Sequence, residues 1–343
     1  MLDDLKMIHE RDAQDALGVA ERQWQQLGQA YDVQTTPPAK PITRVVFAGM
    51  GGSALAALVA QSWPSFNLPF EICRNYDIPS YVDASTLVFA SSYSGNTEET
   101  VSAIEQAGAK GATIAVIASG GKLGEIAASQ GYPFLAVPSG LQPRHALLYM
   151  LKALLVATDA YGITAGKADE LTAKADFLQQ ATAAWIPTVP TDRNPAKQLA
   201  QEIIGKSAVI YAGPKLGPVA YKWKISFNEN AKHVAWTDQF PEFNHNEFLG
   251  WTKQPTDKPY AVIDLRSTLE HPRVQKRFDV TERLLSGMRP SPHVVEAQGG
   301  DLLEQLLWTI ALGDFVSLYT ALLNGLNPTP VDLIETFKKS LDG

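Results

Sequence analysis

A regular alternation of short apolar runs with helical patterns is the feature that most constrains the fold of this chain. The runs at residues 45–48, 86–91 and 113–118 are apolar almost throughout, as are strands that are buried on both faces of a sheet. Small residues and then apolar residues at helical spacing follow these runs. Strands that alternate with helices in this way predict an α/β fold with mainly parallel sheets and helices on both faces.

This pattern continues over most of the chain. In the first half we expect strands at 45–48, 70–73, 86–91, 113–118 and 134–137, and helices at 54–62, 97–107, 123–130 and 144–161. A leading helix is predicted over residues 3–27. A second and sparser series predicts a strand starting at Ala208, strands at 260–264 and 293–297, and helices at 219–231, 270–285, 301–323 and from 331 onward.

Two doubly wound α/β subdomains, with helices at both ends of the chain, account for this organisation. A length of 343 residues also corresponds to about two domains of average size. The predicted boundaries are an N-terminal helix and Pro-rich linker at 1–41, a first domain at 42–161, a helical connection at 162–195 and a second domain at 196–343.

The composition excludes several classes of protein. A formal net charge of -7 argues against a nucleic-acid partner. The single cysteine, Cys73, excludes an internal disulfide and a cysteine-based zinc site, and it fits a reducing compartment, so we expect a cytoplasmic protein. The longest apolar stretch, 302–323, contains Glu304, Gln305 and Asp314, so we interpret it as a domain core or a dimer interface and expect no membrane partner.

The first candidate ligand-binding loop, GMGGSA at 49–54, follows the predicted strand at 45–48 and opens a helix. Glycines allow the backbone to approach an anion, and the N–H groups of the first helical turn point toward it. A tight turn without a ligand and a dinucleotide fingerprint are alternatives. The strand at 70–73 is not followed by the acidic residue that would hold ribose hydroxyls, so a phosphosugar fits this loop better than a nicotinamide.

A second loop, SSYSGNTEE, favours phosphate as the ligand. It places three hydroxyls, on Ser92, Ser94 and Thr97, at another junction of strand and helix, and helix capping alone accounts for only one of them. Loops at 119–122 and 139–144 follow the next two strands. Because the carboxyl ends of parallel strands share one edge of the sheet, we expect all four loops to face one crevice.

The strings GMGGSA, SYSGNTEET, SGGKL and LQPR occur in an order and spacing that resemble the first half of a sugar isomerase (SIS) domain. In the second half, FNENAKH, PEFNHNEFLGW and LGDFVSLYTALLNGLNPTP resemble the prokaryotic bifunctional phosphoglucose/phosphomannose isomerases. The resemblance covers residues 45–338 and implies two SIS-type domains. It also implies the interconversion of glucose 6-phosphate and fructose 6-phosphate, with mannose 6-phosphate as a second aldose, and it implies neither a cofactor nor a metal.

Within this resemblance, each step of an aldose–ketose isomerisation has a candidate residue. Glu229 would move the proton between C1 and C2, and Arg144 would stabilise the enediolate. His245 would open the sugar ring from the neighbouring subunit of a homodimer, and Lys338 would act with it at the ring oxygen. The residues assigned to the 6-phosphate are Gly51, Gly52, Ser53, Ser92, Ser94 and Thr97.

The C-terminal lysine has two adjacent candidates, Lys338 and Lys339. At about 100° per residue, Ile334, Phe337 and Leu341 define one stripe of a helix, which we expect to be buried. Lys338 lies at the edge of this stripe, whereas Lys339 points almost opposite to it. The helical spacing therefore favours Lys338, as the resemblance does.

Other interpretations remain open. Glu229 also fits a solvated helical carboxylate, His245 a structural histidine, and Arg144 a surface arginine at a helix start. The alternative functions are another SIS-domain phosphosugar isomerase and a non-catalytic phosphosugar sensor. Dual specificity requires room beside C2, where the resemblance points to a threonine shortly before the lysine. When the C-terminal lysines are aligned without a gap, Val331 occupies the position of this threonine, and Thr329 is close by.

Overall fold

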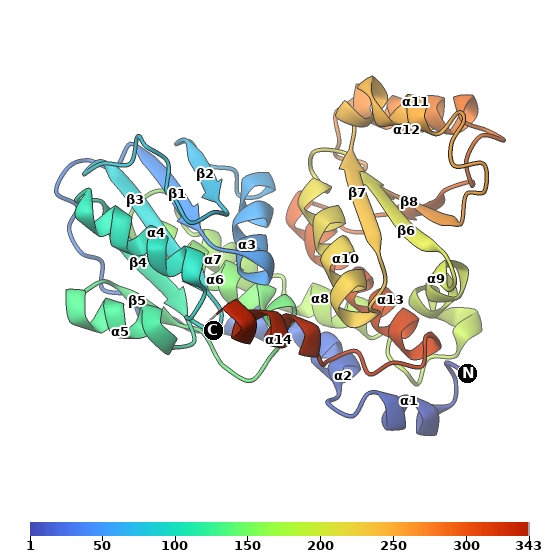
Figure 1. Cartoon of the computed structure of the whole chain (residues 1–343), viewed down its shortest axis with the longest axis horizontal. Coiled ribbons are helices and arrows are strands. Elements are labelled where there is room, and N and C mark those ends of the chain that lie inside the picture. The colour runs from blue at the N-terminus through green and yellow to red at the C-terminus, as the bar shows by residue number, and fades with distance from the viewer. Residues whose placement is uncertain (342–343) are drawn as a thin grey trace. The chain divides into compact units, whose positions relative to one another are not determined.

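The computed structural model describes residues 1–341, and the chain forms two compact units. The first unit is Gln23–Phe177, and the second unit consists of Met1–Arg22 together with the chain from Leu178 onward. Each unit contains one sheet, and all strand pairs in both sheets are parallel (Figure 1). The predicted α/β class with mainly parallel sheets is therefore confirmed.

The first unit is built on a five-stranded sheet with the order β2-β1-β3-β4-β5. Its strands are β1 (Arg44–Ala48), β2 (Phe70–Cys73), β3 (Thr86–Ser92), β4 (Thr113–Ala118) and β5 (Phe134–Ala136). Its helices are η1 (Gln23–Gly28), α3 (Gly51–Ser62), α4 (Glu98–Ala109), α5 (Gly121–Gln130), η2 (Pro143–His145), α6 (Leu147–Ala160) and α7 (Lys167–Thr172). Helices α4 and α5 cover one face of the sheet, whereas α3 and α6 pack together on the other (Figure 1).

Continuous burial explains why the strands of this sheet are apolar at every position. All residues of β3 and β4 are buried. Val46 and Val88, which are paired across β1 and β3, pack with Val101 and Ile104 of α4 in one core cluster. The intervening residues, such as Phe47, face the opposite side of the sheet and are also fully buried. This two-sided burial is what the apolar runs predict.

The second unit is built on a four-stranded sheet with the order β7-β6-β8-β9. Its strands are β6 (Ser207–Ala212), β7 (Ala235–Gln239), β8 (Tyr260–Arg266) and β9 (His293–Glu296). Its helices are α1 (Leu5–Arg11), α2 (Ala16–Glu21), η3 (Thr191–Arg193), α9 (Pro195–Ile203), α10 (Gly217–Asn230), η4 (Glu242–His245), α11 (Glu247–Gly250), α12 (Pro272–Leu284), α13 (Leu302–Leu323) and α14 (Asp332–Leu341). Helix α8 (Ala175–Thr182) spans the point where the two units meet in the sequence.

Helix α13 is the central helix of the second unit. It packs against α2, α9 and α10. By length and composition it could cross a membrane, but 89% of its most apolar 18-residue window is buried inside the protein. The sequence allowed either a domain core or a dimer interface for this stretch, and the structure places the helix in the core of the second unit.

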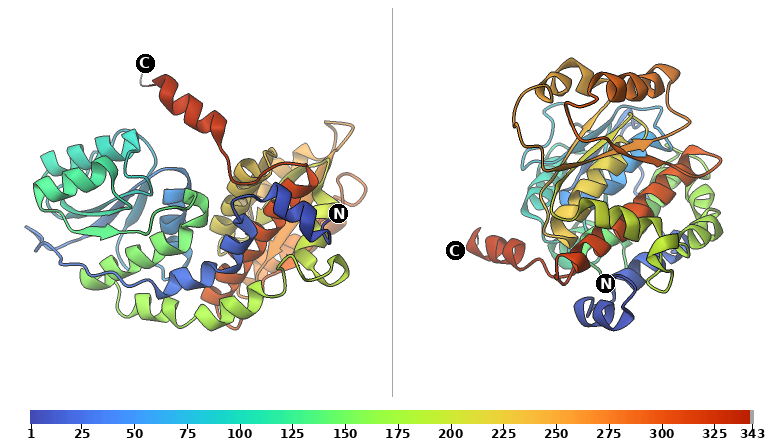
Figure 2. Two further views of the ribbon diagram at one scale, coloured as in Figure 1. Left: turned by 90° about the horizontal axis from the view of Figure 1, so that it is seen from below. Right: turned by 90° about the vertical axis from the view of Figure 1, so that its right-hand side faces the viewer.

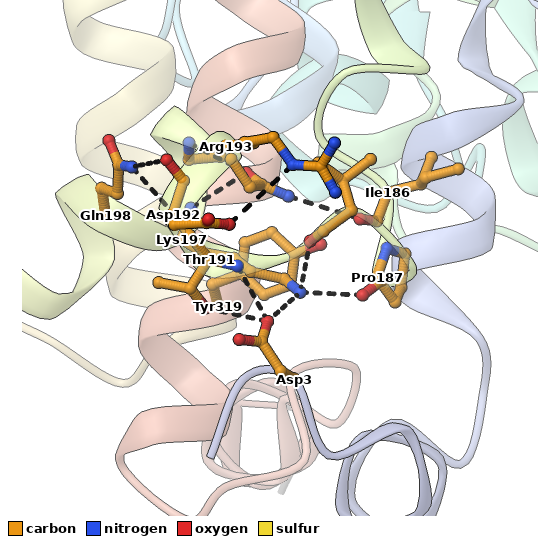
Figure 3. A network of polar contacts seen from close by, with 12 residues as sticks. Asp3, Ile186, Pro187, Thr191, Asp192, Arg193, Lys197, Gln198 and Tyr319 are labelled. Atoms are coloured by element: carbon orange, nitrogen blue, oxygen red, sulfur yellow. Dashed lines mark hydrogen bonds and ion pairs between the residues drawn. The ribbon is translucent and has the colours of Figure 1, made fainter.

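The first residues of the chain are held to the second unit by a buried lysine (Figure 3). Lys197, whose side chain is fully buried, donates to Asp3 Oδ1 at 2.9 Å and to the carbonyl oxygen of Pro187 at 2.8 Å. Its amine also lies 5.6 Å from the ring centre of Tyr319. The hydrogen bond from Lys197 lowers the pKa of Asp3, so this contact is an ion pair at neutral pH.

Residues 1–41 are divided between the two units. Met1–Arg22, which include Asp3, belong to the second unit, and the rest belong to the first. The other division between the units falls at Phe177 and Leu178, inside the predicted connection at 162–195. The domain boundaries at 42–161 and 196–343 remain a prediction.

The prediction of one helix over residues 3–27 is wrong, because two aspartates interrupt it. The carboxylate of Asp12 accepts hydrogen bonds from the N–H groups of Ala16 at 2.8 Å and Leu17 at 2.9 Å. Asp15 has a left-handed backbone, with φ 53°, and caps the start of α2. Aspartates that bond to nearby backbone N–H groups compete with helix continuation, and here they separate α1 from α2.

The strand β7 was not predicted. Its sequence, AWTDQ, has only two apolar residues, and Trp236 is 49% exposed. The strand lies at the edge of the second sheet and pairs only with β6. An edge strand that is solvated on one side carries no continuous apolar run, so the criterion that found the central strands missed this one.

The expectation that Ile334, Phe337 and Leu341 are buried is also wrong. These side chains are 43%, 62% and 56% exposed, and Leu333 is 82% exposed. Helix α14 contains no buried residue, and Figure 2 shows it standing clear of the second sheet and its covering helices. The helical stripe is present as predicted, but the chain's own fold does not cover it.

Candidate functional site

The loops predicted to bind phosphate follow four strands of the first sheet. They connect β1 to α3, β3 to α4, β4 to α5 and β5 to η2. Because the strands are parallel, these loops leave the same carboxyl edge of the sheet. Strand β2 lies on one side of β1 and the later strands lie on the other, so this edge has a switch point, the place where open α/β sheets bind ligands.

The first loop packs closely against the second and the fourth. A Cβ at Gly49 would lie 2.7 Å from the carbonyl oxygen of Ser91, and a Cβ at Gly52 would lie 2.9 Å from the carbonyl carbon of Pro143. No side chain fits at either position. Gly51, the first residue of α3, is exposed and has φ 48°, a conformation that glycine adopts without strain.

The three hydroxyls of the second loop have different surroundings. Ser92 is buried; its Oγ lies 2.8 Å from Thr97 Oγ1 and accepts a hydrogen bond from the N–H of Gly95 at 3.1 Å. Ser94 is exposed, and its Oγ accepts from the N–H of Asn96 at 3.3 Å. The structure thus brings the hydroxyls of Ser92 and Thr97 together. Of the three residues, only the exposed Ser94 and the half-buried Thr97 are accessible to solvent.

Two helices, α3 and α4, begin at this edge without a side-chain cap: their N-cap residues are Met50 and Thr97, and neither side chain accepts a hydrogen bond from its helix. The first turn of α5 is instead bonded to the second loop, since Asn96 Oδ1 accepts from the N–H of Lys122 at 2.9 Å and the carbonyl of Gly95 accepts from the N–H of Leu123 at 2.9 Å. The second and third loops are also in contact, since a Cβ at Gly95 would lie 1.8 Å from the carbonyl oxygen of Gly120. N–H groups at such helix starts favour an anion.

A tyrosine that the sequence analysis did not single out ties the four loops together. The N–H of Tyr93 donates to Ser53 Oγ at 2.9 Å, and its carbonyl accepts from the N–H of Ser119 at 3.0 Å. Its hydroxyl donates to the carbonyl of Pro138 at 2.8 Å and accepts from the N–H of Leu141 at 3.0 Å. Burial raises the pKa of Tyr93, so the hydroxyl keeps its proton. Its partners Ser53, Pro138 and Leu141 lie 40 or more positions away, so no local pattern in the sequence marks Tyr93 for this role.

Ser53 and Arg144, two further predicted site residues of the first unit, are both buried. Ser53 binds the backbone of Tyr93, so one of its roles is to hold the loops together. Arg144 lies in η2, is 0% exposed, and its Nη1 lies 3.5 Å from Gln142 Oε1. This burial excludes the alternative that Arg144 is a surface arginine.

Glu229 lies in the last turn of α10 and is half-buried. The amides on either side of it are engaged in holding the helix end. Asn228 Nδ2 donates to the carbonyl of His233 at 2.8 Å, and the fully buried Asn230 donates to Ser317 Oγ at 2.9 Å. The asparagines of the NEN string therefore fix the backbone around the predicted base.

His245 is exposed at the end of η4, between residues that are anchored. The buried ring of Phe243 lies 4.5 Å from the ring of Tyr211, centre to centre. Asn244 Nδ2 donates to Thr281 Oγ1 at 3.0 Å. The short segment is thus held on the second sheet while the imidazole faces outward from this chain.

A second tyrosine missed by the sequence analysis anchors the other side of this segment. The hydroxyl of Tyr211 donates to the carboxylate of Glu247 and accepts from Trp251 Nε1 at 2.9 Å. The guanidinium of Arg289 lies 5.4 Å from the centre of the Tyr211 ring. Burial raises the pKa values of both Tyr211 and Glu247, so the tyrosine remains the donor in this hydrogen bond.

Lys338 does not lie in a buried site of this chain. Its side chain is 62% exposed, and its Nζ donates to Glu335 Oε1 at 2.8 Å. The chain's own fold therefore leaves both His245 and Lys338 at the surface of the second unit.

No metal cluster accompanies these residues within the described part of the chain. Among residues 1–341, no group of three or more His, Cys, Asp or Glu side chains lies close enough to hold a metal ion. The Cys73 thiol is buried and donates to the carbonyl of Asp77 at 3.1 Å. Hydroxyls, backbone N–H groups, carboxylates and cationic side chains are the groups that the site offers.

Sequence comparisons show which known proteins this chain resembles. Residues 192–341 match the family model for the C-terminal SIS domain of bacterial phospho-glucose isomerase. The bifunctional phosphoglucose/phosphomannose isomerase of Caldicellulosiruptor bescii is 36% identical over 330 residues, 92% of this chain and 96% of the relative. That of Aquifex aeolicus is 34% identical over 304 residues, 88% of this chain and 91% of the relative.

A solved structure has the same fold. The glucose-6-phosphate isomerase like protein from Thermus thermophilus superposes with a TM-score of 0.67, covering 98% of each chain at 19% sequence identity. At this identity the likeness concerns the fold alone.

Two parallel sheets flanked by helices, together with the match to an SIS domain, define a protein of the SIS sugar isomerase class. From its identity with the curated relatives over nearly its whole length, the chain belongs to the bifunctional phosphoglucose/phosphomannose isomerase family. The predicted family and the predicted enzyme class, an isomerase, are thereby confirmed. The roles of individual residues remain predictions.

Proposed function

We propose that this protein interconverts glucose 6-phosphate and fructose 6-phosphate, and mannose 6-phosphate and fructose 6-phosphate, without a cofactor. The observation that carries the proposal is the set of four loops tied together by Tyr93 at the carboxyl edge of the first sheet, in a chain of this family. The starts of α3 and α4, which have no side-chain cap, and the glycines without room for a side chain suit a bound phosphate group.

The proposed mechanism divides the work between phosphate binding and acid–base chemistry. The 6-phosphate is held by the exposed Gly51 and Ser94, the half-buried Thr97 and the N–H group of the buried Gly52. Ser53 and Ser92 shape the loops beneath. Once the ring is open, Glu229 removes the proton from C2 of the aldose and returns it to C1 through a cis-enediol. Arg144 stabilises the negative charge that develops on the enediolate oxygen.

Ring opening is assigned to His245 and Lys338, with His245 supplied by the neighbouring subunit of a homodimer. The exposed positions of both residues support this assignment. The uncovered apolar side chains of α14, which include Leu333 and Phe337, support association of subunits, because apolar patches of this kind mark interaction surfaces. We place the enzyme in the cytoplasm, in glycolysis and gluconeogenesis.

A coupled assay for fructose 6-phosphate tests the function directly. We expect the purified protein to turn over both glucose 6-phosphate and mannose 6-phosphate, since a base that reaches C2 from one side of the enediol forms either epimer after rotation about C2–C3. Turnover of glucose 6-phosphate with none of mannose 6-phosphate would refute dual specificity. Binding without turnover would favour the sensor, and turnover of other phosphosugars only would favour another SIS-domain isomerase.

Replacing Tyr93 with phenylalanine is expected to weaken substrate binding and to leave the chemical step unchanged. The variant keeps the ring and the backbone contacts but loses the hydroxyl that bonds to Pro138 and Leu141. The two lost hydrogen bonds, at about 1 kcal/mol each, correspond to a factor of about 30, so KM for glucose 6-phosphate should rise by up to about 30-fold with kcat near the wild-type value. Steady-state kinetics measure both constants. Tyr132→Phe, in the same unit, is the control, and an unchanged KM in Tyr93→Phe would contradict the prediction.

A further inference from the structure

A buried polar ladder joins α10, the helix that carries Glu229, to the central helix α13. Lys222 and Asp314 form an ion pair, with side chains only 1% and 5% exposed. Ser226, one turn further along α10, accepts from Lys222 Nζ at 2.7 Å and donates to Asp314 Oδ1 at 3.1 Å. All three side chains are therefore satisfied by one another inside the second unit.

The ladder continues to the residue next to Glu229. Asn230 Nδ2 donates to Ser317 Oγ at 2.9 Å, and Ser317 Oγ donates to the carbonyl of Asp314 at 2.9 Å. Lys222, Ser226 and Asn230 are spaced by four residues, so they form one stripe along α10. The last rung of the ladder thus holds the backbone directly after Glu229.

The two helices approach closely beside the ladder. A Cβ at Gly313 of α13 would lie 2.1 Å from Trp223 Nε1, so glycine alone fits beneath the indole. Trp223 Nε1 donates to the carbonyl of Thr309 at 2.8 Å. This contact shows that the two helices pack closely on the side of α10 next to the ladder.

From these contacts we propose that Lys222, Ser226 and Asp314 are positioning residues for Glu229. Their hydrogen bonds and ion pair are directional, so they form in only one register of α10 against α13. Apolar side chains at these positions would pack with similar stability in several registers. A slip by one residue would move Glu229 by about 1.5 Å along the helix axis. A displacement of about 1 Å is enough to lower the rate of a chemical step substantially. The proposal rests on the proposed function, in which Glu229 is the base.

The test replaces the ion pair with apolar side chains in Lys222→Met/Asp314→Leu. Buried ion pairs replaced as a whole often cost no stability, so we expect a folded protein with a Tm close to that of the wild type. We expect KM to be unchanged and kcat to fall about tenfold or more. When fructose 6-phosphate is the substrate and the reaction is run in D2O, more deuterium should be incorporated at C2 of the aldose product per turnover, because a misplaced base returns the proton more slowly and loses it to solvent.

Lys197→Met is the matched control, because it removes another buried lysine and its ion pair with Asp3 without touching α10. It should lower Tm and leave kcat and deuterium incorporation unchanged. If the double variant does not fold, Ser226→Ala removes one rung and should show the same changes to a smaller extent. Normal kcat and normal incorporation in a folded ladder variant would overturn the proposal alone, whereas an inactive wild type would overturn the proposed function itself.

Discussion

Replacing Glu229 with glutamine is expected to abolish isomerisation while leaving the binding of sugar phosphates intact. Glutamine has the size of glutamate, so it can occupy the same place in the last turn of α10, but it cannot accept the proton from C2. General bases contribute about 10² to 10⁴ in rate. We therefore expect kcat to fall by about 10³ or more. Phosphate binding should be nearly unchanged, because the loops that would hold the 6-phosphate belong to the other unit.

The measurement has two parts. A coupled assay gives kcat, and calorimetric titration with glucose 6-phosphate gives the dissociation constant. The matched control is Glu202→Gln, which neutralises an exposed carboxylate on α9 of the same unit and should have wild-type kinetics. Near-normal turnover in Glu229→Gln would remove Glu229 as the base. Loss of both binding and turnover in this variant would instead assign Glu229 to substrate recognition.

Mixing two inactive variants is expected to restore activity if the site is shared between subunits. In Glu229→Gln the base is lost, and in His245→Ala the group proposed to open the ring is lost. A mixed dimer contains one site with Glu229 from one subunit and His245 from the other, and both are intact there. Random pairing of equal amounts yields half mixed dimers, each with one working site, so about one quarter of wild-type activity should return.

The experiment needs exchange of subunits, which co-expression of the two variants with different affinity tags provides. The mixed dimer can then be purified through both tags and assayed for kcat, with about half of the wild-type value expected. Each variant alone, carried through the same procedure, is the control. If His245 acts in its own subunit, no site in the mixed dimer is complete and activity stays at the level of the variants. A single tag-purified species of monomer mass would contradict the homodimer itself.

Much of the fold follows from local patterns in the sequence. The central strands were predicted within one or two residues because burial on both faces demands apolar residues at every position, as in β3 and β4. The turns after them were recognisable because glycines and hydroxyl residues stand where each helix begins. The edge strand β7 was missed for the same physical reason, since one solvated side removes the continuous apolar run.

The candidate site was predictable in its residue types and less so in its contacts. Ser53, Ser92 and Thr97 were chosen as phosphate ligands from their hydroxyls, yet Ser53 and Ser92 are buried and bond within the loops. The residues that connect the loops, Tyr93 above all, carry no local signal for that role. A hydrogen bond from Leu141 to Tyr93 joins positions 48 residues apart, and no spacing rule reaches so far.

The sequence by itself determined the α/β class, the parallel sheets, the loops at their carboxyl edge and the family, because these depend on short-range patterns and strings of adjacent residues. Tertiary structure decided which of the chosen side chains are buried. It also left the apolar stripe of α14 uncovered and joined Lys222 to Asp314 beneath Glu229. Burial and long-range pairing depend on what the rest of the chain places beside a residue, and a local pattern does not contain that information.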